Sequence, residues 1–418
     1  MANYFNPNKK EISGPTNVVR MEGKIHGIKK VIYLFFDWHV PMYAQSECDN
    51  IFAKDIEKYL VENFYELSKK SSTTYDFFLE IRPTEELLGK QDERLEQKNK
   101  YKGIYIEQVM KLFRKIFKYD KEKNKVDIPE IFANIRVHFL DIRDYLKNHF
   151  FYKLLRVRRI AFESFMYLDI HTEALKYMID QYEIVAKHLE FMITAMSTTK
   201  FEKTINKQII IKPKELEGVD EQMIMNLMDK IRNGYKDDNI KKIMNTKLDS
   251  LVEKLNELLK EIRDAVDVFK KYGSIPPNIK QMLTKDERYH DIYTYGLSPY
   301  VLKDIVVDIS NICDTIFFKT MFLFAELTDI YFLRRFLDKD YITNGIVYSG
   351  GAHSENYVYI LVNDFGFDIT HVAYSSSKNI DELTKDIKNL PIKELTRIFS
   401  PPILNQCSDI SHFPDNFL

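Results

Sequence analysis

Three side chains that could carry acid–base or metal chemistry follow apolar segments of this sequence. His39 comes just after the apolar run 31–36, with Asp37 two positions before it, while Glu80 and His353 end two further apolar segments. Open α/β sheets place their ligands at the carboxyl ends of strands. Two histidines and a carboxylate form a recurring set of ligands for a divalent metal ion with open positions. We therefore expect a site at His39, Glu80 and His353, with Asp37 as an additional acid or base.

Each of these residues also has a structural interpretation. A lone histidine at a strand end more often serves packing than catalysis, and a carboxylate inside an apolar strand needs a partner such as Arg82 because burying it unpaired is costly. Arg335, or its neighbour Arg334, could orient a carboxylate or an anion through bidentate hydrogen bonds. An arginine at a helix end is equally explained by the helix dipole. His138 and Asp141 are weaker candidates on another predicted strand.

Hydrophobic periodicity predicts the elements that must position these residues. The pattern predicts strands at both chain ends and long helices between them, so the expected fold is α/β, with a mixed or mostly parallel sheet built from both chain ends and a large α-helical insertion. The order of strand, loop, helix and strand near the N-terminus predicts a parallel pair with a crossover helix. The expected strands lie at 16–37, 75–83, 135–143, 346–349 and 370–374, and the expected helices at 51–70, 106–117, 150–198, 248–269, 298–338 and 357–367. The expected divisions are an N-terminal α/β part at 15–145, a helical insertion at 146–338, a C-terminal α/β part at 339–405 and a tail at 406–418.

Charge, hydropathy and cysteine content indicate which partners and which compartment to expect. The formal net charge is -1, so no overall field favours nucleic acid. The most apolar stretch, 301–336, contains repeated charges, and no membrane span is expected there. No signal peptide is read at the N-terminus. The cysteines Cys48, Cys313 and Cys407 are interpreted as small buried thiols in a reducing compartment, which predicts the cytoplasm, or a virion if the source is viral.

Four segments taken in order resemble the TraB/GumN and Tiki proteins and their wider ChaN and erythromycin-esterase relatives. The segments are VIYLFFDWHV, YDFFLEI, TDIYFLRRF and IVYSGGAHSENYVYILVNDFGF, and the last contains the family's Gly-x-x-His as Gly350 to His353. The first departs from the family pattern, because Phe36 stands in place of a glycine and Asp37 in place of a glutamate. The resemblance implies that His39, Glu80, Arg335 (or Arg334) and His353 line one site. The residue bias also resembles that of uncharacterised giant-virus proteins.

Three functions are consistent with these observations. The first is a metal-dependent hydrolase, which the Tiki resemblance implies to be a peptidase, using Mn, Co, Zn or Fe on a small-molecule or peptide substrate. The second is a metal-free esterase-like hydrolase in which His39 activates water and Glu80 assists. The third is a non-enzymatic virion or host-interaction protein that binds a protein partner through the helical insertion.

Overall fold

The chain divides into two compact units, each described here by itself. The first consists of Met1–Asp141 with Tyr331–Leu418, and the second of Ile142–Ile330. The fold class expected from the sequence is confirmed, since strands from both chain ends form one mixed sheet and the middle of the chain is helical. The computed structural model describes residues 5–39, 48–80, 104–120, 125–146, 150–167, 172–197, 221–273, 299–403 and 405–417.

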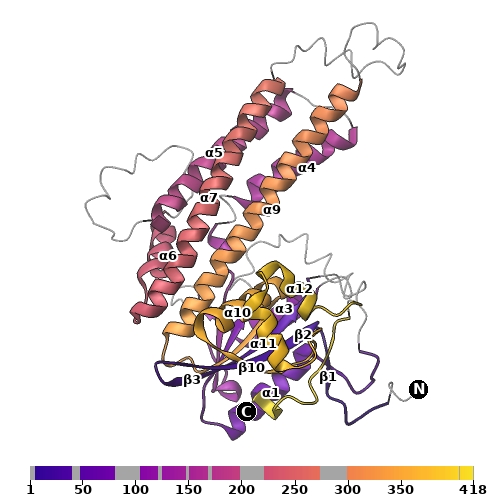
Figure 1. Ribbon diagram of the computed structural model, residues 1–418, viewed down its shortest axis with the longest axis vertical. Coiled ribbons are helices and arrows are strands. Elements are labelled where there is room, and N and C mark those ends of the chain that lie inside the picture. The colour runs from indigo at the N-terminus through magenta and orange to yellow at the C-terminus, as the bar shows by residue number, and fades with distance from the viewer. Residues whose placement is uncertain are drawn as a thin grey trace. The chain divides into compact units, whose positions relative to one another are not determined.

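The first unit is built on a six-stranded sheet with the order β10-β2-β3-β9-β5-β8 (Figure 1). The strands β3, β9, β5 and β8 run parallel to one another, while β2 pairs antiparallel with both β3 and β10. The four parallel strands therefore end at the same edge of the sheet. The strand bounds are β2 Asn17–Ile25, β3 Ile28–Asp37, β5 Tyr75–Leu79, β8 Ile135–Phe139, β9 Asn344–Gly350 and β10 Asp368–Val372.

The predicted parallel pair near the N-terminus is wrong in one respect. Strands β3 and β5 run in the same direction, but β9 from the other end of the chain lies between them and pairs with both. Its residues Ile346, Val347 and Tyr348 are fully buried, as expected for a central strand covered on both faces. The insertion of β9 places the strand ends that precede His39, Glu80 and His353 next to one another.

Helices cover the two faces of this sheet. One face is packed by α1 and α3 over an aromatic-rich core, to which Phe64, Phe77 and Phe113 contribute mutual ring contacts. On α1 the apolar residues recur at steps of three and four, so a single face of the helix is buried. The other face is packed by α10, where Tyr357 contacts Phe332. The helix bounds in this unit are α1 Ile56–Lys70, α3 Tyr105–Ile116, α10 Gly351–Phe365, α11 Ile380–Asn389 and α12 Leu395–Phe399.

The last residues of the chain are part of this unit and not a tail. Strand β11 pairs antiparallel with β1, which also pairs with β4, and Phe417 packs in the core under β3. Cys48 and Cys407 form a disulfide, which corrects the expectation of three thiols; only Cys313 is a free and buried thiol within the described residues. The short strands are β1 Glu11–Ser13, β4 Lys54–Asp55, β6 Tyr119–Asp120, β7 Lys125–Val126 and β11 Cys407–Asp409.

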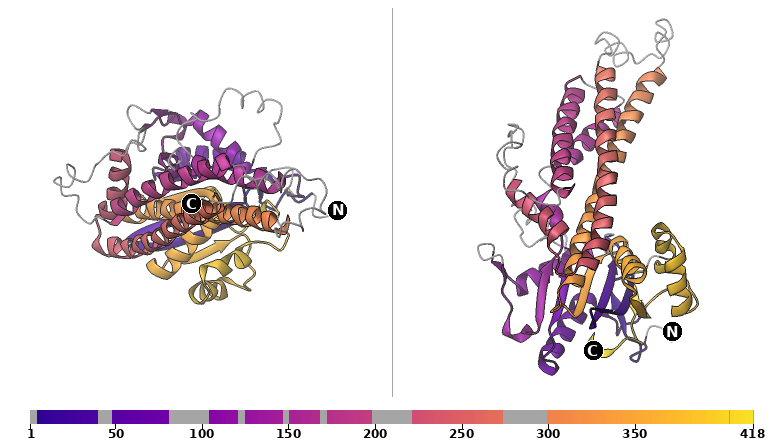
Figure 2. Two further views of the ribbon diagram at one scale, coloured as in Figure 1. Left: turned by 90° about the horizontal axis from the view of Figure 1, so that it is seen from above. Right: turned by 60° about the vertical axis from the view of Figure 1, so that its left-hand side comes forward.

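The second unit is a bundle of long helices, as the apolar stripes predict. The stripe on α7 is buried along the helix, from Leu248 to Phe269. Ion pairs between Arg263 and Glu190 and between Lys254 and Glu326 show that α7 runs beside α5 and α9 (Figure 2). None of the helices in the described part of the chain combines the length and apolarity needed to cross a bilayer. The bounds are α4 Phe151–Tyr167, α5 Thr172–Ser197, α6 Glu221–Asn233, α7 Asp238–Gly273 and α9 Pro299–Asp338, whose last turns from Tyr331 onward belong to the first unit.

Candidate functional site

The first part of the candidate site is a turn at the end of β3. The backbone N–H of His39 donates to Asp37 Oδ2 over 3.0 Å, which is the local bond of an Asx turn. His39 adopts a left-handed backbone with φ of 46°, which is uncommon for a residue with a side chain. The turn brings the His39 ring toward the carboxylate of Asp37, with 3.5 Å between His39 Nε2 and Asp37 Oδ2. The His39 side chain is partly exposed, while Asp37 is buried.

The second part is a buried carboxylate at the end of β5. Glu80 Oε2 accepts a hydrogen bond of 2.7 Å from the backbone N–H of Gly350, and Glu80 Oε1 lies 3.0 Å from His353 Nε2. Register explains this meeting, because β9 pairs with β5 up to Tyr348 opposite Leu79, so that Glu80 and Gly350 both stand just beyond the paired strands. Glu80 and His353 are both buried. The predicted proximity of His353 and Glu80 is thus present in the structure.

Gly350 joins the two parts. A β-carbon built at this position would lie 3.2 Å from His39 Cε1, 3.3 Å from His39 Nε2 and 3.4 Å from Glu80 Oε2. The His39 ring and the Glu80 carboxylate therefore both lie close to Gly350, where an added β-carbon would crowd them. The partly exposed imidazole of His39 thus lies near the buried carboxylate of Asp37 and, at Gly350, near that of Glu80.

The environment of Asp37 opposes its ionisation. Burial raises the pKa of Asp37, and the nearby charge of Glu80 raises it further, while His39 and a hydrogen bond from Tyr348 act in the opposite direction. The Tyr348 hydroxyl donates to Asp37 Oδ1 over 2.9 Å and is fully buried on β9. Tyr348 is not among the site residues predicted from the sequence. The alternation of side chains along β9 could have predicted that Tyr348 is buried. Its hydrogen bond to Asp37, however, can be predicted only when the register between β3 and β9 is known.

The metal ligand set predicted from the sequence stays a prediction, and contacts within the protein already occupy part of it. Both oxygens of Glu80 are already engaged, by His353 and by the backbone of Gly350. No group of three or more His, Cys, Asp or Glu side chains stands at metal-binding geometry within the described ranges. His353 contacts Glu80 directly, and the His39 ring and the Glu80 carboxylate both lie close to Gly350.

The remaining sequence candidates lie on or just after β8, as His138 and Asp141 do, or near the end of helix α9, as Arg334 and Arg335 do. His138 Nε2 is 2.6 Å from the buried carboxylate of Asp76, which Arg136 also binds through two nitrogens. Burial lowers the pKa of His138, and the charge of Arg335 lowers it further, while the hydrogen bond with Asp76 acts in the opposite direction. Arg334 is buried and stacks near Tyr331. Arg82, the suggested partner of Glu80, lies outside the described residues.

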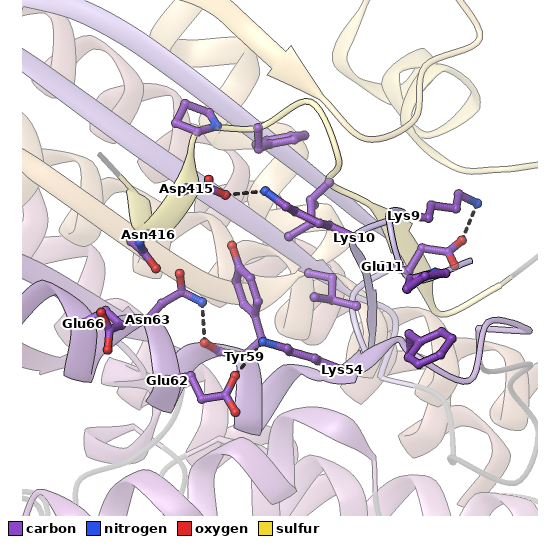
Figure 3. Close-up of a pocket in the computed structure, with 16 residues that line it drawn as sticks. Lys9, Lys10, Glu11, Lys54, Tyr59, Glu62, Asn63, Glu66, Asp415 and Asn416 are labelled. Carbon is purple, nitrogen blue, oxygen red and sulfur yellow. Dashed lines mark hydrogen bonds and ion pairs between the residues drawn. The ribbon is translucent and has the colours of Figure 1, made fainter. Parts of the chain in front are cut away.

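Phe36, which replaces the glycine of the resembling family, does not block this site. It is buried and its ring lies 5.6 Å from that of Phe399, on the face of β3 opposite to Asp37. Two cavities in the described part of the chain also lie away from His39. One of about 380 Å³ lies between β1, α1 and the C-terminal turn, with Tyr59 and Asn63 among its lining residues (Figure 3), and one of about 470 Å³ lies beside Cys407.

The fold and this site define an α/β protein with two histidines and two buried carboxylates at one edge of its sheet. The sequence matches, over residues 10–418, the model of a family described as a family of unknown function (DUF5847), and the chain belongs to that family.

Relatives of this chain occur in Acanthamoeba polyphaga mimivirus. One uncharacterized protein of that virus is 39% identical over 99% of this chain and 98% of its own length. Two others are each 34% identical, over 98% and 97% of this chain and 98% of their own lengths. No solved structure matches the chain. The family and these relatives carry no description of an activity.

Proposed function

We propose that the protein is a hydrolase in which His39 activates water at the carboxyl edge of the sheet. The observation that carries the proposal is the partly exposed imidazole of His39 close to Gly350 and to the buried carboxylate of Asp37, with buried Glu80 on the same glycine. An imidazole has the protonation range of a general base near neutral pH. The convergence of His39, Glu80 and His353 also supports the proposed kinship with the TraB and Tiki proteins.

The residues around His39 have distinct roles in this proposal. His39 Nε2 faces Asp37, so the other ring nitrogen takes the proton of a water molecule as that water attacks a carbonyl carbon. The imidazolium then gives this proton to the leaving alcohol or amine as the tetrahedral oxyanion collapses and the C–O or C–N bond breaks. Asp37 orients the ring and stabilises the imidazolium that forms, and Tyr348 positions Asp37. Helix α10 begins at Gly351, next to Gly350, and the positive end of its dipole favours the negative charge that develops on the carbonyl oxygen.

In this proposal the buried pair of Glu80 and His353 holds the backbone at the end of β9, beside which the reaction takes place. Glu80 binds the backbone of Gly350, so it fixes the start of α10, and His353 satisfies the other oxygen of the carboxylate. The substrate class follows from the chemistry alone: esters or amides of small molecules or peptides, whose carbonyl group could reach a partly exposed ring.

A pair of histidine variants tests the proposal. His39→Asn removes the imidazole, while His26→Asn makes the same change in the β2–β3 turn; both histidines have left-handed backbones, which asparagine tolerates. The probes are p-nitrophenyl acetate and fluorescein-labelled casein. We expect His39→Asn to lower kcat/KM on the substrate that is cleaved by roughly 10²-fold or more and His26→Asn to leave it unchanged. Wild-type protein that cleaves neither probe, or equal activity of His39→Asn and the wild type, would refute the proposal.

A second candidate keeps the hydrolytic reaction and adds a divalent ion such as Mn, Co, Zn or Fe. The observation in its favour is the repulsion between two neighbouring buried carboxylates, visible in the effect of Glu80 on the pKa of Asp37, which a cation would relieve. Because the contacts of Glu80 are already occupied, its carboxylate would have to leave His353 to bind the ion. Metal analysis of the purified protein and of Asp37→Asn decides this: stoichiometric metal lost in Asp37→Asn supports the ion, and metal-free active protein excludes it.

The disulfide bears on the compartment and on the non-enzymatic alternative. Disulfides persist in oxidising environments, which include virion surfaces, and are rare in the cytosol. The Cys48–Cys407 bond and the mimivirus relatives therefore favour a virion component over a protein of the host cytoplasm. A virion or host-interaction protein without activity remains the alternative to the hydrolase, and loss of hydrolysis with retained virion incorporation would favour it.

A further inference from the structure

Helix α4 presents an apolar stripe to solvent. Its inward face packs with Leu154, Val157 and Ala161, which are buried, while Leu155, Phe162 and Met166 are 48%, 55% and 60% exposed. These three residues recur at the steps of seven and four that place side chains on one face of a helix. A helix of a bundle normally turns such residues inward, so this stripe lies on a second apolar face that the described residues leave uncovered.

Helix α9 extends the stripe. Arg158 of α4 lies over the rings of Phe317 and Phe318 and pairs with Asp314, so α4 and α9 are neighbours within the second unit (Figure 1). Phe322, one turn beyond Phe318, is 68% exposed. The apolar face is defined by these exposed side chains: Tyr152, Leu155, Phe162, Phe165, Met166, Phe318 and Phe322. Together they expose on the order of 600 Å², which reaches the upper range for the largest apolar patch of an ordinary monomer.

The charges within the apolar face are self-complementary. Arg159 and Glu163 lie on α4 between Leu155 and Met166, and they form an ion pair of 2.9 Å with both side chains mainly exposed. Consider a two-fold axis beside α4 between positions 160 and 161. Two antiparallel copies of the helix then place Leu155 opposite the second copy's Met166 and Arg159 beside the second copy's Glu163. Each contact occurs twice, as an isologous interface requires.

We propose that the apolar face of α4 and α9 binds a second copy of this chain to form a two-fold dimer. Two such faces would bury on the order of 1,200 Å² in total, the lower bound for a specific and stable interface. A strongly acidic or basic partner would fit less well, because the ionic pair at the centre of the stripe contains one charge of each sign.

Charge exchange tests the dimer without removing any buried group. Arg159→Glu places two acidic side chains together at both symmetric contacts, Glu163→Arg places two basic ones together, and the double exchange restores opposite charges. The matched control is Arg263→Glu on α7, which breaks an exposed pair with Glu190 outside the apolar face. Phe162→Asp tests the apolar contact in the same way.

The measurement is sedimentation velocity of the full chain across a concentration series. We expect a dimer for the wild type, an increase of at least tenfold in the dissociation constant for each single exchange and for Phe162→Asp, and recovery in the double exchange. The Arg263→Glu control should dimerise like the wild type. A wild type that is monomeric throughout, or a double exchange no better than the single ones, overturns the proposal. Binding of a monomeric wild type to phosphatidylserine vesicles, lost in Phe162→Asp, would also overturn it by assigning the face to a membrane surface.

Discussion

Replacing Gly350 by alanine should displace the His39 ring while leaving the fold intact. The added β-carbon would stand 3.2 Å from His39 Cε1 and 3.4 Å from Glu80 Oε2. Carbon atoms in contact prefer roughly 3.5–4.0 Å, so the ring must move by about 0.3–0.8 Å. A misplacement of about 1 Å can cost roughly 10²-fold in rate, so we expect kcat/KM to fall by about tenfold.

The stability of this variant should change little. Gly350 has φ of -55° and ψ of 148°, a conformation that alanine adopts without strain, and its N–H remains available to Glu80. Alanine also restricts the unfolded chain, which stabilises the fold by about 0.4–1 kcal/mol and offsets part of the crowding. We therefore expect the free energy of unfolding in urea to stay within about 1 kcal/mol of the wild type.

The neighbouring glycine supplies the control. A β-carbon at Gly351 would meet nothing closer than the backbone oxygen of Asp37 at 3.7 Å, an ordinary contact. Gly351→Ala should therefore keep both the rate and the NMR signals of the His39 ring, while Gly350→Ala should change both. Equal behaviour of the two variants, in the rate and in the ring signals, would refute this account of the site.

Three further changes test separate parts of the structure. His353→Gln should lower the free energy of unfolding by roughly 1–3 kcal/mol, because buried Glu80 loses its imidazole partner, and an unchanged urea midpoint would argue against the pair. Burial raises the pKa of Glu355 from 4.5 to about 7, so the folded state binds this proton more tightly than the unfolded chain and stability falls as the pH rises between these values, by on the order of 3 kcal/mol. Glu355→Gln should flatten that loss between about pH 5 and about pH 8, and an unchanged slope would contradict the assignment. Reduction of the Cys48–Cys407 disulfide should lower the free energy of unfolding by about 2–5 kcal/mol, which urea denaturation with and without dithiothreitol measures, and equal midpoints would show that the bond does not constrain the chain.

The sequence predicted the elements with a strong hydrophobic period and the residues at strand ends. The apolar stripe at 248–269 recurs at helical spacing and predicts α7, and the short apolar run at 31–36 predicts β3. Each pattern can bury its apolar side chains in only one kind of element. The meeting of His39, Glu80 and His353 followed from one rule, that parallel strands end at the same edge of a sheet.

Features that depend on register and on long-range pairing could not be predicted. The insertion of β9 between β3 and β5 joins segments about three hundred residues apart, and no local pattern encodes it. The hydrogen bond from Tyr348 to Asp37 and the Cys48–Cys407 disulfide have the same origin, with a separation of 359 residues for the latter. Glu80 was expected to need a partner. That its partners are His353 and the backbone N–H of Gly350 depends on where β9 ends beside β5.

The central claim is that the His39 ring lies against Gly350, near the buried carboxylates of Asp37 and Glu80. A nuclear Overhauser experiment on protein labelled only at histidine and glycine measures this contact directly. The structure predicts a strong cross-peak between the Hε1 proton of His39 and an α-proton of Gly350, and its loss in His39→Asn identifies the signal. A wild-type spectrum that lacks this cross-peak, while the assigned His39 ring contacts other residues, would contradict the site and the function built on it.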